Sequence, residues 1–304
     1  MQDQTRPFGD LELIVVDDGN ASRIETSDLV AQNDQSLSTF QLRVIRQANS
    51  GPAAARNFGA QEAKGELLAF LDDDCLAHSS WLEKLLDKIQ QYPQALIGGL
   101  STNALHKNIF SVANQLILDI VYEHYNRDPS DAHFLASNNW LCRRDLFLKV
   151  GGFDESFRQA GGEDRDFCSR WRGAGYSIVW QKEAVAEHRH FQNLSKFVNM
   201  HFRYGQGAFG FHASNVRSDP QNGNSTVRFY LQLLPAAIRH IRCISSRWTR
   251  GQIVGLLFIW QFFNALGFIQ QALKSSLGNL RSQNKKHQGE HVASREIEPF
   301  GNGK

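Results

Sequence analysis

Short apolar runs alternate with helical patterns over the first hundred residues, and two of these runs end in aspartates. The runs at 11–16 and 67–71 lead into the segments Asp17-Asp18-Gly19 and Asp72-Asp73-Asp74. Strands that alternate with helices predict an α/β fold with a layered, mostly parallel sheet. Ligands bind outside the carboxyl ends of the strands in such sheets, so we expect the two acidic segments to share one site.

Local signals predict where the other elements begin. Gly51-Pro52 opens a helical pattern, and Ser80 and Glu83 have the spacing of a capping box, which predicts a helix that starts at 81. By the same patterns we expect further strands at 42–45, 95–97 and 177–180, and helices at 53–63, 81–91, 108–125, 164–172 and 194–211.

The charge of the chain is small overall and unevenly distributed. The 304 residues carry a net charge of +2, which argues against nucleic acid as a partner. Residues 220–289 contain nine Lys or Arg and no Asp or Glu. This asymmetry indicates a basic surface that meets an anionic one, such as a lipid leaflet.

The cysteines and the N-terminus bear on the cellular compartment. Cys75, Cys142, Cys168 and Cys243 are scattered without C-x-x-C spacing, which argues against zinc and against a disulfide framework. Free thiols fit a reducing cytosol. Residues 1–10 are polar and lack the apolar segment of a secretory signal.

A long apolar segment lies in the C-terminal third. Residues 251–273 contain no charge, and a membrane-spanning helix needs only about 20 mostly apolar residues. Several amides interrupt the segment, so spanning, interfacial and soluble-core placements all stay open. The residues that interrupt it are Gln252, Gln261, Asn264, Gln270 and Gln271.

The triple aspartate has the chemistry of a metal site. A departing diphosphate needs its charge neutralised, and a divalent cation held by carboxylates does this without proton transfer. Asp72 and Asp74 alternate along an extended segment, so their side chains can share a face. Their oxygens would select Mg²⁺ or Mn²⁺. A solvated acidic loop is the alternative interpretation of the same residues.

Five motifs in order resemble glycosyltransferase family 2, which has the GT-A fold, over residues 7–211. The motifs are Leu13–Gly19, Asn49–Gly59, Phe70–Asp74, Gly151–Glu155 with Gly162–Phe167, and, more loosely, His188 with Arg203–Gly207. The resemblance implies a catalytic domain over 1–215. We expect a helical, membrane-associated region over 226–275 and a disordered polar tail over 276–304.

The resemblance also implies roles on the donor side. Asp17 or Asp18 would contact the base or ribose, and Arg56 would lie near the diphosphate. Asp72 and Asp73 would bind the donor. The implied metal ligands are Asp74, Asp72 and His188, with Asp74 as the first choice.

On the acceptor side, the resemblance makes Asp164 the general base. A carboxylate at the start of a helix is stabilised as an anion by the helix dipole, which would keep it ready to accept a proton. A single displacement would invert the anomeric configuration. Glu163, Arg203 and Tyr204 would line the acceptor side.

The pattern departs from the family at its start. Members begin with a strand, a donor-contacting loop and a helix that precede the match to 11–17, and we expect this first strand and helix to be absent. The alternative to an enzyme is therefore a truncated, non-catalytic remnant that binds a nucleotide or a partner. A metal-dependent phosphohydrolase ranks lower because the sequence has neither a nucleophilic Asp motif nor a His-rich two-metal cluster. The absence of a G-x-x-x-x-G-K-[ST] loop disfavours a P-loop NTPase.

The expected partners follow from these assignments. We expect a nucleotide-sugar donor, with a UDP-sugar as the first choice, and a lipid or polysaccharide acceptor. The basic, apolar C-terminal third suggests a place at the cytoplasmic face of the inner or plasma membrane.

Overall fold

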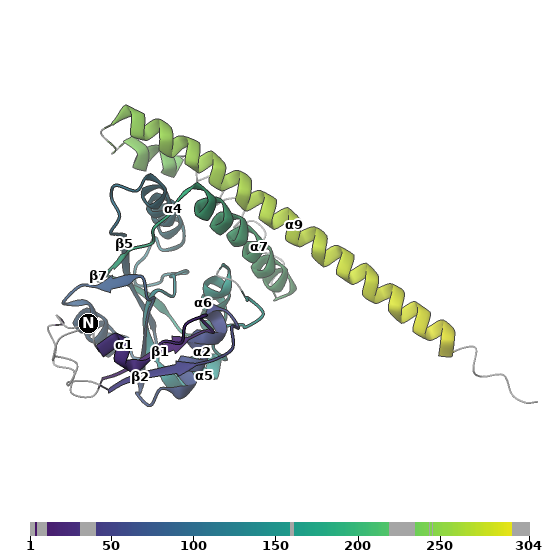
Figure 1. Cartoon of the computed structure of the whole chain (residues 1–304), viewed down its shortest axis with the longest axis horizontal. Coiled ribbons are helices and arrows are strands. Elements are labelled where there is room, and N and C mark those ends of the chain that lie inside the picture. The colour runs from purple at the N-terminus through teal and green to yellow at the C-terminus, as the bar shows by residue number, and fades with distance from the viewer. Residues whose placement is uncertain are drawn as a thin grey trace, which may run out of the picture.

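The computed structural model describes residues 4, 11–30, 41–158, 161–218, 235–242, 244 and 246–293. Helices and strands alternate as the sequence predicts (Figure 1). The elements are β1 (Glu12–Asp17), α1 (Thr26–Val30), β2 (Gln41–Arg46), α2 (Pro52–Glu62), β3 (Leu67–Leu71), β4 (Cys75–Ala77), α3 (Trp81–Gln91), β5 (Leu96–Asn103), α4 (Ile109–Tyr125), β6 (Asn139–Arg143), α5 (Arg144–Val150), α6 (Glu163–Gly173), β7 (Ile178–His188), α7 (Leu194–Ser218) and α9 (Arg247–Ala293).

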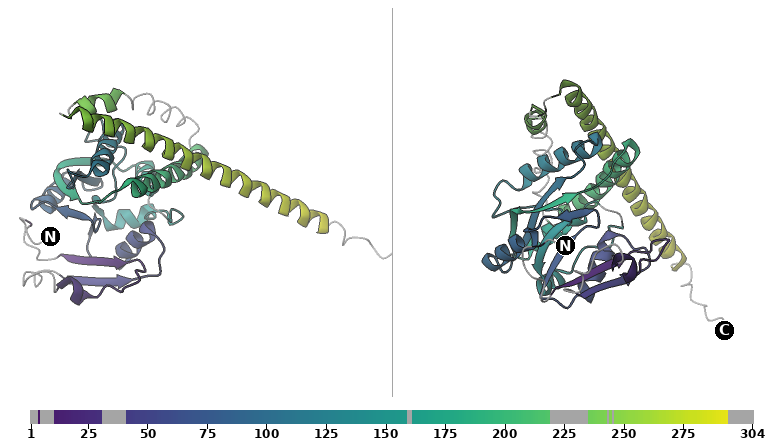
Figure 2. Two further views of the ribbon diagram at one scale, coloured as in Figure 1. Left: turned by 45° about the horizontal axis from the view of Figure 1, so that its top comes forward. Right: turned by 60° about the vertical axis from the view of Figure 1, so that its left-hand side comes forward.

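The described strands form two sheets. β1 and β2 pair in parallel, with Glu12 opposite Gln41 and Asp17 opposite Arg46. The other five strands pair in the order β3-β6-β5-β7-β4. Within the described residues no strand joins the two sheets, and Figure 2 shows β1 and β2 side by side in both views.

The α/β prediction is confirmed, but the expectation of a mostly parallel sheet is wrong for the larger sheet. There β5 and β7 are parallel, and the β3–β6, β5–β6 and β4–β7 pairings are antiparallel. The sequence patterns identified only the strands of longer apolar runs. They missed β4, which has three residues, and β6, which contains no β-branched residue, and these two strands make every antiparallel pairing.

Alternate side chains of the five-stranded sheet enter two different cores. Ile97, Leu141 and Val179 pack under α3, which presents Trp81 and Leu85 from one face. The neighbouring residues point to the opposite side, where α2, α5 and α6 cover the sheet. That second core contains Leu96, Trp140, Cys142, Phe147, Phe153, Phe167, Trp171 and Ile178.

The C-terminal helices pack on the rest of the molecule. α9 has 47 residues, so it is about 70 Å long, and it lies across α7 (Figure 1). Ile253, Leu256 and Trp260 are buried with Ile117 of α4 and Phe197 of α7. In the described part of the chain, one segment, Arg247–Leu277, is long and apolar enough to span a membrane.

The expected domain limits differ from these helices. α7 continues beyond 215, and α9 continues through residues 276–293, which we expected to be disordered. The reason is composition: 276–293 is polar, but its Leu, Arg, Gln and Lys residues have good helix propensity. The rest of the expected tail, 294–304, lies outside the described residues.

Candidate functional site

Asp17 shapes the loop that follows β1. Its side chain is fully buried and accepts hydrogen bonds from the amide of Asn20 at 3.0 Å and from the amide of Ile24 at 3.4 Å. The bond from Asn20 has the largest effect on its pKa. Together with the Ile24 bond, it holds the pKa of Asp17 below the ordinary value against the opposing effect of burial. Both carboxylate oxygens of Asp17 thus accept bonds from its own loop.

Asp18 ties the loop after β1 to the loop that precedes α2. Its Oδ1 accepts from Gln47 Nε2 at 2.7 Å and from the amide of Ser50 at 2.8 Å, and its Oδ2 accepts from the amide of Gly51 at 2.9 Å. Gly51 has a φ of 93°, and a Cβ there would collide with the backbone of Arg158. The glycine therefore allows the amide to turn toward Asp18 at the start of α2.

An open cleft of about 540 Å³ lies between these loops, and two arginines line it. Arg46 donates to the carbonyl of Asn20 at 2.8 Å and lies 3.5 Å from the Asp17 carboxylate. Arg23 is largely exposed and pairs with Glu25 at 3.1 Å. Two guanidinium groups make the cleft suitable for an anion. Its lining residues are Gly19, Arg23, Arg46, Gln47, Ala48 and Asn49.

Arg56 links the acidic end of β3 to the start of α6. From α2, its guanidinium donates to Asp72 Oδ1 at 2.8 Å and lies 3.7 Å from Glu163 Oε1. It also lies over the ring of Phe153, 5.6 Å from the centroid. Burial opposes the charge of Arg56, but Asp72, Asp164 and Glu163 outweigh it and raise the pKa of Arg56. One cation therefore joins carboxylates from two elements.

Glu163, which is buried, and Asp164, which is partly buried, form a carboxylate pair at the first turn of α6. Burial raises the pKa of Glu163 to about 7, helped by the charge of Asp164, although Gly161 donates its amide to Glu163 at 2.6 Å. Burial also raises the pKa of Asp164, against the opposing effects of Arg56 and Ser137. The Oδ1 atom of Asp164 has no hydrogen-bond partner in the described structure, so it can accept a proton.

We expected the helix dipole to stabilise the ionised form of Asp164, whereas burial favours its neutral form. Burial is the largest influence on the pKa of Asp164, and its direction is upward. A raised pKa makes the carboxylate a stronger proton acceptor wherever it is ionised.

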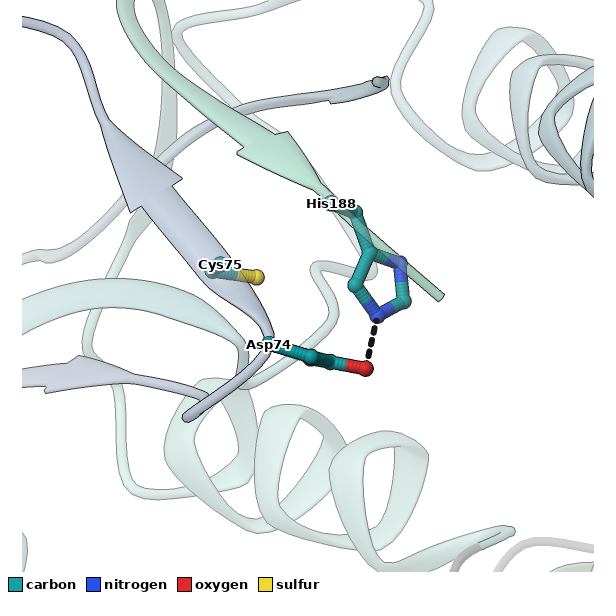
Figure 3. A group of neighbouring side chains, drawn as sticks. All are labelled: Asp74, Cys75 and His188. Carbon is teal, nitrogen blue, oxygen red and sulfur yellow. Dashed lines mark hydrogen bonds and ion pairs between the residues drawn. The ribbon is translucent and has the colours of Figure 1, made fainter. Parts of the chain in front are cut away.

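Asp74 and His188 meet at the junction of β4 and β7. His188 Nε2 lies 3.1 Å from Asp74 Oδ2, and Cys75 lies opposite His188 in the strand register (Figure 3). Burial alone would lower the pKa of His188, but Asp74 outweighs it and raises that pKa. Ligand atoms of the three residues lie within 4.8 Å of one another, which is close enough for one ion. Burial, helped by the charges of Asp72 and Asp74, raises the pKa of Cys75 to about 12, so its thiol is neutral when no ion is bound.

The remaining predicted residues lie at the margins of this arrangement. Asp73 is exposed in the turn between β3 and β4, and Arg203 is exposed on α7. Tyr204 lies beside the loop that precedes α6, since a Cβ on Gly161 would be 2.9 Å from Tyr204 Cδ1.

The structure also identifies residues that the sequence patterns did not. Arg23 and Arg46 line the cleft, Cys75 joins the Asp74–His188 pair, and Ser137 bonds to Asp164. No spacing rule relates these residues to their partners, because the contacts come from loops and strand pairings far apart in the chain. Only the cysteine directly after the triple aspartate could have been noticed in advance.

Two family models match the chain. The model of glycosyl transferase family 2 matches residues 1–151, and a model described as the N-terminal domain of galactosyltransferase matches residues 120–194. Together the matches include every site element from β1 to β7.

Several curated relatives are glycosyltransferases. The chain is 31% identical over 204 residues to the pre-mycofactocin glycosyltransferase of Mycobacterium tuberculosis, covering 65% of this chain and 42% of the relative. It is 29% identical over 206 residues to glycosyltransferase AglE of Haloferax volcanii, covering 67% and 64%. It is 22% identical over 268 residues to a glucosyl-dolichyl phosphate glucuronosyltransferase of the same organism, covering 85% and 84%. The chain thus spans less than two thirds of the length of the first two relatives.

A solved structure shares the fold. The mannosyltransferase of Pyrobaculum calidifontis, in complex with GDP-Man and Mn²⁺, superposes with a TM-score of 0.59 at 16% identity. The match covers 90% of this chain and 79% of the mannosyltransferase chain. This likeness confirms the fold that the sequence motifs imply.

Proposed function

Since the chain belongs to glycosyl transferase family 2, we propose that it transfers a sugar from a nucleotide-diphosphate donor to an acceptor hydroxyl, with inversion and metal assistance. The observation that carries this proposal is the bridge made by Arg56. It joins Asp72, on the donor side, to the Glu163-Asp164 pair, on the acceptor side. A donor and an acceptor bound to these two groups would meet at one place.

The donor would lie along the carboxyl ends of β1 and β3. Asp18 and the loop around Gly51 support the nucleoside end, and the cleft with Arg23 and Arg46 supplies positive charge for phosphates. A carboxylate has about four acceptor positions, so Asp18 can accept a bond from a base or ribose beside its three protein bonds. A UDP-sugar is the first donor to test, with a GDP-sugar beside it.

Asp74 and His188 would hold the divalent ion, together with Asp72 and the donor phosphates. Their oxygen and nitrogen atoms suit Mn²⁺, and Mg²⁺ would favour the carboxylates. When bound, such an ion neutralises the charge that develops on the leaving diphosphate. The role of these side chains would be to hold the ion and so to orient the diphosphate.

Asp164 would be the general base. Its unpartnered Oδ1 takes the proton of the acceptor hydroxyl while that oxygen bonds to the anomeric carbon. The bond from the anomeric carbon to the diphosphate oxygen breaks, and the nucleoside diphosphate leaves with the electron pair. Attack opposite the leaving group inverts the anomeric configuration. The acceptor would be a lipid or a polysaccharide, and the glucosyl-dolichyl phosphate glucuronosyltransferase among the relatives supports a lipid-linked one.

Two substitutions separate donor binding from chemistry. Calorimetry with Mn²⁺ and a UDP- or GDP-sugar measures binding, and release of the nucleoside diphosphate measures transfer or hydrolysis. We expect Asp74→Ala to weaken Mn²⁺-dependent donor binding by about tenfold or more. We expect Asp164→Asn to bind donor normally and to lose transfer by about 10²–10⁴-fold.

Asp145→Asn is the matched control, because Asp145 is exposed on α5 and pairs only with Arg143 in the described structure. It should bind and transfer like the parent. Unchanged donor binding in the Asp74→Ala variant would contradict the assignment of Asp74 as a metal ligand. Transfer at the parental rate in the Asp164→Asn variant would contradict the assignment of Asp164 as the general base. Donor binding by the parent without any turnover would favour the non-catalytic alternative.

A further inference from the structure

One face of α9 packs tightly against the body of the protein. Ile253, Leu256, Leu257 and Trp260 are at most 8% exposed. Farther along the helix, Gly267 lies against the carbonyl of Phe202 on α7. The helix is therefore held in place along this face by side-chain packing and by a close backbone contact.

The opposite face of α9 is apolar and exposed. Seven large apolar side chains recur at steps of three or four residues, so they lie along one side of the helix, and we call them the outer stripe. They are Val254, Phe258, Phe262, Leu266, Ile269, Leu273 and Leu277. Phe258 is 73% exposed and Phe262 is 63% exposed. The stripe is about 35 Å long, and soluble proteins rarely leave such a surface uncovered.

The charged side chains of residues 220–289, which include most of α9, are all cationic. Arg247, Arg250 and Lys274 lie on α9, and Arg242 lies on the preceding helical segment. Arg239 of that segment pairs with Glu123 of α4 at 3.4 Å, so we do not count it among the free cations. An apolar stripe with a cationic border complements a leaflet of anionic lipids. The apolar side chains would contact the acyl chains, and the cations would pair with the negatively charged headgroups.

We propose that the outer stripe of α9 seats this protein on the surface of an anionic lipid bilayer, with the helix axis parallel to the membrane plane. A spanning placement would require α9 to leave α7 and α4, since its inner face is buried against them. Pairing with a second copy through the stripe would bring the cations of two α9 helices together, and residues 220–289 contain no Asp or Glu to offset them. The inference does not depend on the proposed transfer reaction, because it concerns binding alone.

Co-sedimentation of the full chain with vesicles tests the proposal. One set of vesicles contains phosphatidylcholine alone, and the other contains about one quarter phosphatidylglycerol. We expect binding to the anionic vesicles and weaker binding in about 0.5 M salt, which screens the attraction. The double substitution Phe258→Ser with Phe262→Ser should weaken binding by about a hundredfold, since each buried phenyl ring contributes about tenfold or more. Arg247→Gln with Lys274→Gln should weaken it by about tenfold or more.

The matched control is Tyr92→Ser with Leu148→Ser, which removes two exposed large side chains, one directly after α3 and one on α5, away from α9. This variant should bind vesicles like the parent, and near-identical thermal unfolding of all variants would show that none has lost its fold. Alkaline carbonate should release the bound protein, as expected for a helix that lies on the surface.

Three outcomes would overturn the proposal. The first is no binding of the parent to anionic vesicles. The second is equal binding of the parent and the double Phe variant. The third is resistance to alkaline carbonate, which would indicate a spanning helix. A parent dimer in light scattering that the Phe substitutions dissociate, without lipid binding, would assign the stripe to a second copy instead.

Discussion

At the scale of single residues, hydrogen-bond donors decide how a buried carboxylate behaves. Asp17 and Glu163 are both buried, at 0% and 3% exposure. Asp17 accepts bonds from two amides and lies near Arg46, and its pKa falls. Glu163 accepts one amide and shares Arg56 with other acids, and its pKa rises to about 7. The first carboxylate is a structural anchor, and the second is poised to titrate near neutral pH.

The raised pKa of Glu163 predicts a pH-dependent stability. An acid with a higher pKa in the folded state binds more protons when folded than when unfolded. Its favourable contribution is complete below the unfolded pKa of about 4.5 and is lost as pH rises through about 7. We expect Glu163→Gln to reduce the fall in the free energy of unfolding between these pH values by about 1–3 kcal/mol, as measured by urea denaturation.

Glu66→Gln is the control for this experiment, because Glu66 is exposed just before β3. It should keep the pH slope of the parent. Some slope should also survive in Glu163→Gln, because burial raises the pKa of Asp119, Asp164 and Asp166 as well. An unchanged slope in Glu163→Gln would contradict the raised pKa of Glu163.

At the scale of elements, glycines set how closely α7 and α9 approach. Gly267 of α9 lies against the carbonyl of Phe202, and Gly205 of α7 lies against the backbone of Asn264. Gly255 also lies on α9, but a Cβ added there would face open space. The same substitution should therefore have opposite effects at two positions of one helix.

We expect Gly267→Ala to lower the free energy of unfolding by about 1–3 kcal/mol, because the new methyl group meets backbone atoms that can move only by separating the helices. Gly255→Ala should raise it by up to about 1 kcal/mol, because alanine favours the helix and meets nothing. Thermal unfolding of both variants measures the difference. Equal effects at the two positions would contradict the close crossing.

The elements also show how far the sequence could lead. Apolar runs that end in aspartates predicted β1 and β3 closely, and Arg56 contacts both Asp72 of the triple aspartate and Glu163, the neighbour of Asp164. Strand pairing could not be predicted, because β4 and β6 are too short or too weakly patterned to recognise. The contact of Asp74 with His188 depends on that pairing, and so does the place of Cys75. Sequence patterns locate the helices and strands, but long-range packing decides which strand ends lie next to each other.

At the scale of the whole molecule, the two-stranded sheet is stabilised by fewer strand pairings than the five-stranded sheet. β1 and β2 pair only with each other among the described strands, and an isolated two-stranded sheet is marginal in water. Packing on α2 and the bonds of Asp18 hold it in place. This difference predicts that the two sheets open with different free energies.

Hydrogen exchange followed by mass spectrometry measures these opening free energies. We expect the amides of β1 and β2 to exchange about tenfold faster or more than those of β5 and β7, which lie inside the larger sheet. A nucleotide sugar with Mn²⁺ should slow exchange in β1 and β2 most, because the cleft lies at their ends. Equal protection of both sheets, with and without donor, would contradict this division.

The pairing of Asp74 with His188 also has a consequence for the order in which the protein is made. The two residues are 114 positions apart, and the strand that carries His188 is also the partner of both β4 and β5. A ribosome adds about 5–20 residues each second, so Asp74 leaves it about 6–23 seconds before His188 does. From the time β5 leaves the ribosome until β7 follows, β5 lacks its parallel neighbour. The nascent chain thus presents an unpaired strand edge while its acidic loop is already exposed. In this period a chaperone that covers the edge of β5 would do most to prevent aggregation.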